Sequence, residues 1–221
     1  MTFRMTFRTA AVTTALIILA MLAAAIWVSG QVPADQMVTT QWDQHGNPGR
    51  ETPASVAVFL MVGAAAFAWI VCWLVPRIDP RRENIARSGH AYGTIWVGVT
   101  LVMAVGHAAI LSATLGSPLP VERIIPASVG LLFMAIGNVM GKLRPNFMAG
   151  IRTPWTLSDD HVWDKTHRFG GKVMVAAGFA ILTAGLMTGG DTFVAIMLTA
   201  ITGMVTLPVA YSYLLWRRRR T

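Results

Sequence analysis

Charged residues are scarce in this sequence, since Asp, Glu, Lys and Arg together make up 13% of 221 residues. A soluble globular domain carries roughly 25%, so the chain has about half the charge that a water-facing surface requires. Hydrophobic residues make up 54%, which excludes an intrinsically disordered protein, because disordered chains are poor in apolar side chains. A single cysteine, Cys72, excludes a disulfide framework and a cluster of thiolate metal ligands. The composition is that of a membrane protein.

Long runs without any acidic or basic residue account for most of the chain. After turn-forming ends are removed, they predict spanning helices over residues 9–30, 54–75, 91–115, 124–141, 173–189 and 192–215. A helix needs about 20 apolar residues to cross about 30 Å of hydrocarbon. Barrel strands alternate apolar and polar residues, whereas these runs are apolar on every face. The predicted fold class is therefore an all-α polytopic membrane protein with six transmembrane helices.

The first of these spans has some features of a cleavable signal peptide. Arg4 and Arg8 precede an apolar run that contains three consecutive alanines, residues 23–25. The apolar run continues through Val28, beyond the 7–15 residues of a signal sequence. We therefore expect the segment to be retained as a membrane helix.

The basic residues are distributed unequally between the segments that connect the spans. If the N-terminus is cytoplasmic, all but two of the 18 Lys and Arg residues are also cytoplasmic, the exceptions being Arg50 and Arg123. The positive-inside rule then predicts that both termini lie in the cytoplasm. The net charge of +8 indicates attraction to the anionic inner leaflet of the bilayer, and direct binding of nucleic acid is not expected.

The first external loop, residues 31–53, is the only sizeable surface outside the membrane. Its segment 46–49, Gly-Asn-Pro-Gly, predicts a turn, and the preceding Trp42 suits the membrane–water interface. The loop is interpreted either as a structured cap over the outer helix ends or as a ligand-facing surface. The residues predicted to face a ligand are Trp42, Asp43, His45, Gly46 and Pro48. Two candidate ligands on one turn do not define a metal site.

The longest cytoplasmic segment, residues 142–172, is the most unusual part of the chain. Two prolines prevent a continuous helix in its first half. Ser158 is a good N-cap and Gly170–Gly171 a helix end, which predicts a short interfacial helix between the fourth and fifth spans. Its apolar face consists of Val162, Trp163, Thr166 and Phe169, with Asp160, Asp164 and His167 on another face. Those last three side chains could hold a metal, but N-terminal acids and an interfacial histidine require none.

Two polar residues fall within predicted spans, His107 in the third and Asn138 in the fourth. Polar groups in a bilayer are costly, so both are expected to face the bundle interior, either as interhelical hydrogen bonds or as functional groups. Gly137 and Gly141 form a pattern that permits close helix approach. No acidic residue lies within any span, and no nucleophile–base pair is recognisable. We therefore expect no catalytic residues, no cofactor and no metal.

The cytoplasmic segment resembles the signature of the SdpI immunity-protein family. The matching motifs are Gly137-Asn138, Lys142-x-Arg144-Pro145-Asn146, Gly150-Ile151-Arg152-Thr153-Pro154-Trp155-Thr156-Leu157, Val162-Trp163-x-Lys165-Thr166-His167-Arg168 and Gly171-Lys172. The external loop also resembles the amino-terminal domain of unknown function that precedes this signature in the family. Its pattern is represented by Pro33, Gln41-Trp42-Asp43 and Gly46-x-Pro48, where Gln41 and Asp43 replace the usual His and Asn.

This resemblance implies a protein of the bacterial cytoplasmic membrane that protects the cell from a secreted peptide of the SDP killing type. It also implies two partners, the peptide toxin outside and a helix-turn-helix repressor held at the membrane inside. Residues 1–75 would form an N-terminal two-helix unit, and residues 76–221 an SdpI-like region ending in the basic tail 217–220. Two alternatives remain open from the residues alone, a small transporter using His107 and Asn138, or a membrane-embedded enzyme acting on lipid head groups.

Overall fold

A computed structural model describes residues 7–219, so Arg4 and Arg220 of the basic termini lie outside the described residues. The helices long and apolar enough to cross a membrane are α1 (Phe7–Ser29), α2 (Ala54–Ile78), α4 (Gly89–Thr114), α5 (Val121–Met140), α7 (Asp160–Met187) and α8 (Gly190–Arg218). The shorter elements are strands β1 (Met37–Thr39) and β2 (Glu51–Pro53) and helices α3 (Arg82–Arg87) and α6 (Pro154–Ser158). The six predicted spans are confirmed, and the protein is an all-α multi-pass membrane protein.

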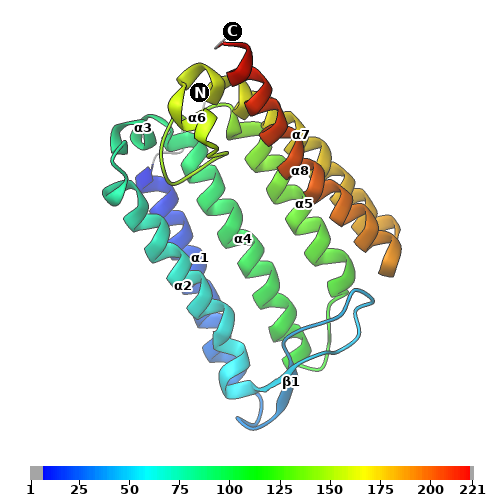
Figure 1. Ribbon diagram of the computed structural model, residues 1–221. Helices are drawn as coiled ribbons and strands as arrows, with labels where there is room; N and C mark the ends of the chain where they lie inside the picture. Colours follow the sequence, from blue (N-terminus) through cyan, green and yellow to red (C-terminus); the bar gives the residue numbers. More distant parts are fainter. Residues whose placement is uncertain (1–6, 220–221) are drawn as a thin grey trace, which may run out of the picture.

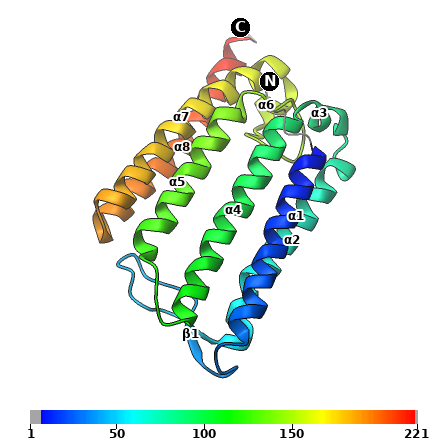
Figure 2. The same cartoon turned by 180° about the vertical axis from the view of Figure 1, so that it is seen from behind.

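The long helices form two groups that meet along α4 and α5 (Figures 1 and 2). Helices α1, α2 and α4 pack against one another, as do α5 and α7, and α7 and α8. The start of α1 and the end of α8 lie at the same end of the bundle, together with α3 and α6 (Figure 1). We call this the termini end; the opposite end, which carries the β1–β2 hairpin, is the hairpin end.

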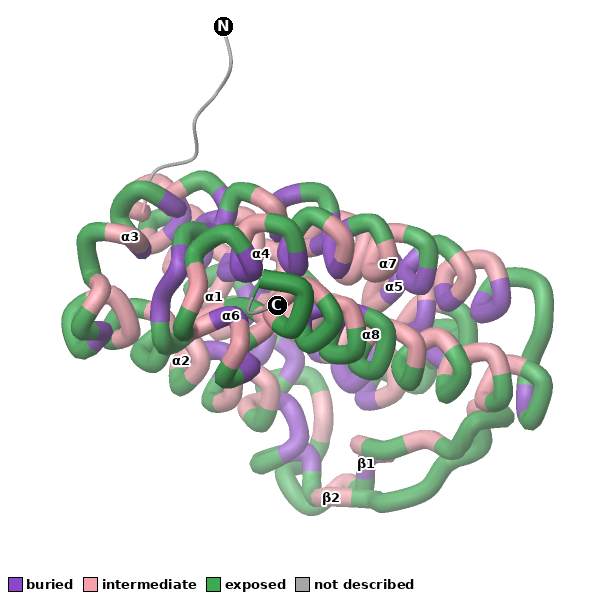
Figure 3. Tube along the Cα trace, turned by 45° about the horizontal axis from the view of Figure 1, so that its top comes forward, coloured by how far each residue is buried: buried purple, intermediate pink, exposed green. Residues whose placement is uncertain are grey.

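The outward surfaces of the helices are apolar. Phe67 is 70% exposed and Leu16 is 60% exposed, while the buried positions face neighbouring helices (Figure 3). A soluble monomer rarely exposes large contiguous apolar patches. In a bilayer the same side chains contact lipid tails without cost. Because lipid gives no hydrophobic drive to bring helices together, they associate by close packing, which small residues at the contacts allow.

Glycines bring α5 and α7 into backbone contact. A Cβ atom added at Gly171 would lie 2.5 Å from the Gly137 carbonyl oxygen, and one at Gly178 would lie 2.6 Å from the Gly130 carbonyl oxygen. Of the predicted close-approach pair, Gly137 makes this contact, whereas Gly141 faces the Arg168 side chain. The absence of side chains at these positions sets the distance between the two helices.

The prediction of a separate interfacial helix ending at Gly170–Gly171 is wrong. Residues 160–187 form one continuous helix, α7, and its N-cap is Asp159 rather than Ser158. The Asp159 side chain accepts hydrogen bonds from the backbone N–H groups of His161 and Val162. Gly170 and Gly171 are glycines because other elements approach them closely, since a Cβ at Gly170 would lie 2.6 Å from the Ile151 side chain.

The two polar residues within spans have different surroundings. His107 is buried, and its Nε2 atom lies 3.0 Å from the Val58 carbonyl oxygen of α2, which is an interhelical hydrogen bond. The prediction that Asn138 faces the bundle interior is wrong, because its side chain is exposed. The neighbouring Gly137 occupies the contact face of α5, and one residue further turns the helix by about 100° away from that face.

Candidate functional site

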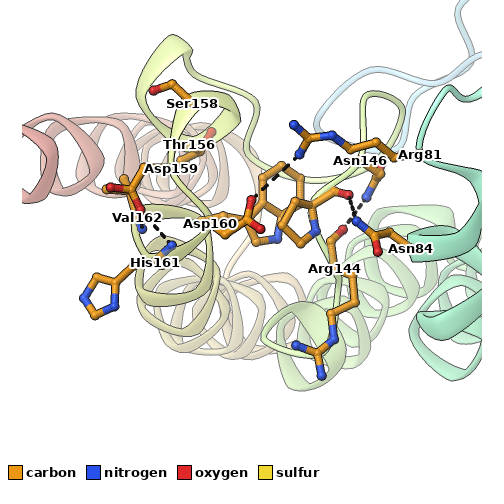
Figure 4. Close-up of polar contacts among 12 residues, drawn as sticks. Arg81, Asn84, Arg144, Asn146, Thr156, Ser158, Asp159, Asp160, His161 and Val162 are labelled. Carbon is orange, nitrogen blue, oxygen red and sulfur yellow. Dashed lines mark hydrogen bonds and ion pairs between the residues drawn. The ribbon is translucent and has the colours of Figure 1, made fainter.

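The segment after α5, residues 141–153, is attached by hydrogen bonds to the connection between α2 and α4. The Arg144 backbone N–H donates to Ser88 Oγ at 2.8 Å, and the Phe147 N–H donates to the buried Asp79 carboxylate at 2.9 Å. The Asn84 side-chain amide donates to the Pro145 carbonyl oxygen at 2.7 Å (Figure 4). These partners come from outside the segment, so its path depends on the first half of the chain.

Asn146 holds the turn that follows. Its side chain is buried, and its Oδ1 atom accepts hydrogen bonds from the N–H groups of Met148 at 2.9 Å and Ala149 at 2.6 Å. Its Nδ2 atom donates to the Arg144 carbonyl oxygen at 2.9 Å. All of these bonds are local, which is the usual role of asparagine in turns.

His167 connects the segment to α7. Its Nε2 atom accepts a hydrogen bond from the Ile151 N–H at 2.9 Å, so Nδ1 carries the proton and donates to the Trp163 carbonyl oxygen at 2.9 Å. The Trp163 indole stacks on the imidazole with a centroid distance of 4.0 Å and donates to the Leu143 carbonyl oxygen at 2.8 Å. Gly150 has φ +116°, and a Cβ there would overlap His167. The histidine placed with the acids on a polar face is therefore buried and holds the segment in place.

The arrangement leaves His167 without a nitrogen that could bind a metal. Asp160 forms an ion pair with Arg81 at 3.9 Å, and it is exposed (Figure 4). Among residues 7–219, no group of three His, Cys, Asp or Glu side chains converges on a point.

Helix α6 is held by threonines. Thr153 and Thr156 form a reciprocal capping box, and the Thr156 hydroxyl also donates to the Ile151 carbonyl oxygen at 2.8 Å. The Thr153 hydroxyl lies 3.3 Å from Ser212 Oγ of α8. Trp155 packs edge-to-face on Tyr213 of α8, with ring centroids 5.1 Å apart. The segment is thus fixed to α8 as well as to α7.

The predicted signature residues divide into a framework and a set of exposed cations. The buried framework residues are Pro145, Asn146, Thr153, Trp163, Thr166 and His167, and half-buried Trp155 and the α6 N-terminal Pro154 extend it. The exposed cations are Arg144, Arg152, Lys165 and Arg168. Arg152 donates to the Phe147 carbonyl oxygen at 2.6 Å, which directs its guanidinium back over the segment. The framework explains most of the motif structurally, and the cations are the part of the motif that it leaves exposed.

At the hairpin end, strands β1 and β2 pair antiparallel, with Met37 opposite Pro53. Asp43 closes the hairpin tip, because its carboxylate accepts hydrogen bonds from the N–H groups of His45 at 2.8 Å and Asn47 at 2.9 Å. The Asn47 side-chain amide donates to the same carboxylate, and this bond is the main reason that the pKa of Asp43 is lowered from 3.8. Gly46 has φ +81°, as the predicted turn requires.

We expect the hairpin tip to keep its conformation from neutral pH down to about pH 4. Because the Asp43 pKa is lowered in the folded hairpin, the ionised carboxylate stabilises the turn fully at pH values above the unfolded pKa. This stabilisation is lost as the pH falls through the lowered pKa. NMR titration of the Asp43 carboxyl carbon should give a pKa below 3.8. Asn47→Ala should raise it, and Gln44→Ala should leave it unchanged. A wild-type value of 4 or higher would contradict this account of the turn.

The hairpin tip lies over the ends of α5 and α8 that are at the hairpin end of the bundle. The Gln44 amide is 3.5 Å from the Asp191 carboxylate of α8. A Cβ at Gly46 would lie 3.0 Å from the Glu122 carboxylate of α5, and one at Gly190 would lie 2.7 Å from the His45 ring. His45 therefore lies against Gly190 of α8, and Gly46 lies against Glu122 of α5. Trp42 forms a β-bridge with Pro48.

Between the tip and these helices is a cavity of about 470 Å³. Trp42, Asp43 and Gln44 line it from the hairpin. Its other lining residues are Val121, Glu122, Ile125 and Pro126 of α5, and Phe193, Val194 and Met197 of α8. The sequence predicted only Trp42 and Asp43 of this lining, because no local pattern indicates that residues 121–126 and 193–197 lie opposite them. The cavity combines an apolar floor with two carboxylates, Asp43 and Glu122.

Comparison with known proteins gives one family match and two similar relatives. Residues 142–212 match the SdpI/YfhL protein family. Immunity protein SdpI of Bacillus subtilis (strain 168) is 34% identical over 103 residues, which cover 47% of this chain and 49% of that protein. The uncharacterized protein YfhL of the same organism is 31% identical over 70 residues, which cover 30% of this chain and 64% of that protein. No solved structure matches the chain.

The matched region contains the exposed cations, the buried His167 and Ser212 of α8, which contacts Thr153 at the start of α6. The chain spans about half the length of the first of these relatives. Residues 142–212 of this chain are thus similar to the SdpI/YfhL family.

Proposed function

We propose that this protein confers immunity against a secreted antimicrobial peptide at the cytoplasmic membrane of a bacterium. The similarity to an immunity protein supports the function, and the six apolar helices support the location. The single observation that carries the proposal furthest is the cavity beneath the hairpin, because it offers an apolar surface and carboxylates to a peptide arriving from outside.

The proposed orientation has both termini in the cytoplasm. Every described basic residue at a helix end or in a connection lies at the termini end, except Arg50 and Arg123. Cytoplasmic connections carry such an excess of Lys and Arg. The hairpin end then faces outward, and the N-terminal unit, residues 1–75, supplies the surface that meets the peptide.

The chemistry of the cavity favours an amphipathic, cationic peptide. Phe193, Ile125 and Met197 provide apolar contacts. The Asp43 carboxylate is ionised at neutral pH, and its hydrogen bond with Asn47 lowers its pKa from 3.8. Glu122 is a second acidic residue in the lining. Opposite charges also accelerate association by steering the ligand.

The SdpI-like region, residues 76–221, would transmit a signal to the cytoplasm when the peptide binds outside. Arg152, Lys165 and Arg168 project from a rigid framework, so they present fixed positive charge to a partner such as a membrane-held repressor. A signal requires that the peptide bind two states of the protein with different affinities. Helices α5 and α8 are the proposed route, because both line the external cavity and both contact α7 or α6.

Neither alternative function gains a specific observation. The His107 ring bonds to a backbone carbonyl of α2, so the one histidine buried mid-span has a structural role. Asn138 faces outward and does not extend a path through the bundle. We infer that the chain is not an enzyme.

Filling the external cavity should abolish protection. Val194→Trp places an indole among the lining residues, so cells that produce this variant should be killed by an SDP-type peptide at the concentration that kills cells lacking the gene. Val205→Trp is the matched control, because Val205 lies on α8 with 59% exposure and does not line the cavity. Survival curves at equal membrane abundance provide the measurement. Full protection by Val194→Trp would contradict a role for the cavity.

A further inference from the structure

A groove between α5 and α7 opens on the outer surface of the bundle at the termini end. It has a volume of about 740 Å³, and its apolar part is lined by Met134, Val175, Ala176 and Phe179. Phe179 is 57% exposed. The contact of Gly137 with Gly171 keeps the two helices close, so the side chains beside it form the walls of a trough.

The end of the groove nearest the termini is polar and basic. Asn138, Arg168 and Lys172 line it there, and all three side chains are exposed. Gly141 and Arg168 also line a second cavity of about 280 Å³, so the two spaces adjoin at these residues. The other residues of that cavity are Arg87, Lys142, Leu143, Arg144 and Asp164.

The positive charges of this region are not neutralised by the protein. Among residues 7–219, neither Arg168, Lys172 nor Lys142 forms an ion pair. Asp164 is the one acidic residue that lines the groove or the cavity. Guanidinium and ammonium groups gathered at a helix end bind phosphate oxygens through charge-assisted hydrogen bonds.

We propose that the groove and cavity together bind one anionic phospholipid of the leaflet at the termini end. The acyl chain lies against Phe179, Val175 and Met134, and the phosphate meets Arg168 and Lys172. The Asn138 amide lies at the level where a lipid passes from its glycerol to its tails, which explains an exposed amide within the α5 span. The Lys142, Arg144 and Arg87 side chains receive the rest of an anionic head group.

This inference is independent of the immunity function, since it requires only that the helices lie in a bilayer. It also assigns a second role to Arg168, which belongs to the signature motif but not to the buried framework. A bound lipid would join α5 to α7 beside the glycine contact, at the base of the segment that holds the exposed cations.

The test is native mass spectrometry of the full chain in detergent with phosphatidylglycerol or phosphatidylcholine. Wild-type protein should retain one phosphatidylglycerol and no phosphatidylcholine. Arg168→Gln with Lys172→Gln should weaken phosphatidylglycerol binding about thirtyfold, since each juxtamembrane basic residue contributes about 1 kcal/mol. Arg168→Lys with Lys172→Arg should keep the binding.

The matched control is Arg82→Gln with Arg217→Gln, which removes two exposed charges from the same end of the bundle outside the groove. It should retain the lipid. Ala176→Trp should displace the acyl chain, whereas Ala195→Trp on the exposed surface of α8 should not. Equal binding of the two lipids by wild-type protein, or equal losses in the groove and control variants, would overturn the proposal.

Discussion

Replacing Gly171 with alanine is expected to destabilise the protein by about 3 kcal/mol, although alanine is the better helix former. The added Cβ atom would lie 2.5 Å from the Gly137 carbonyl oxygen, and backbone atoms on both sides cannot move without separating α5 from α7. A loss of this size lowers the melting temperature by roughly 6–12 °C in a chain of this length. The melting temperature is measured in detergent, with size-exclusion chromatography as the readout of the protein that remains folded.

Gly63→Ala is the matched control for this effect. Gly63 is also helical, in α2, but a Cβ there meets no atom within 4 Å. Its melting temperature should be unchanged or higher, because only helix propensity changes. If both variants melt like wild type, the α5–α7 contact is not set by backbone packing.

His167→Ala is expected to release the segment after α5. The substitution leaves the Ile151 N–H and the Trp163 carbonyl without their imidazole partners and removes the ring that stacks on Trp163. The Trp163 carbonyl keeps its helical backbone bond within α7, but the unsatisfied Ile151 N–H costs about 1–3 kcal/mol. The cavity left by the ring adds to this cost, so the local loss is about 3 kcal/mol or more. Hydrogen exchange of the amides in residues 146–153 should become at least a hundredfold faster.

His161→Ala is the control, because His161 lies on the same helix and its exposed ring is directed away from the segment (Figure 4). Its amide exchange over residues 146–153 should match that of the wild type. Unchanged exchange in His167→Ala would mean that other bonds, such as those of Asn146, hold the segment without the histidine.

The helices were predictable because lipid imposes a simple rule on sequence. Each span must be long and apolar, so charge-free runs located all six, and their number is confirmed. The ends of the helices were predicted less well. Helix α7 begins at Asp160 rather than at residue 173, because its first turns are covered by the segment after α5 and not by lipid. Gly170 and Gly171 looked like a helix end, since a single sequence does not distinguish a glycine that stops a helix from one that another backbone approaches.

The site was predictable in its residues but not in their roles. The motif identified Asn146, Thr153 and His167, yet only the fold showed that they serve as a framework. His167 was assigned to a polar face because helical spacing does not reveal that Ile151 approaches from outside the helix. The cavity beneath the hairpin depends on contacts between the hairpin and helices that follow it by about 80 and 150 residues, which no local pattern encodes.

Both proposed functions require that the hairpin face outward while the exposed cations face the cytoplasm. In a Cys72→Ala background, Gln44→Cys and Lys165→Cys place single thiols at the two exposed ends of the bundle. A membrane-impermeant maleimide applied to intact cells should label the thiol at position 44 and should reach position 165 only after the membrane is permeabilised. Labelling at position 165 in intact cells, with position 44 protected, would contradict the orientation and the functions proposed for both ends.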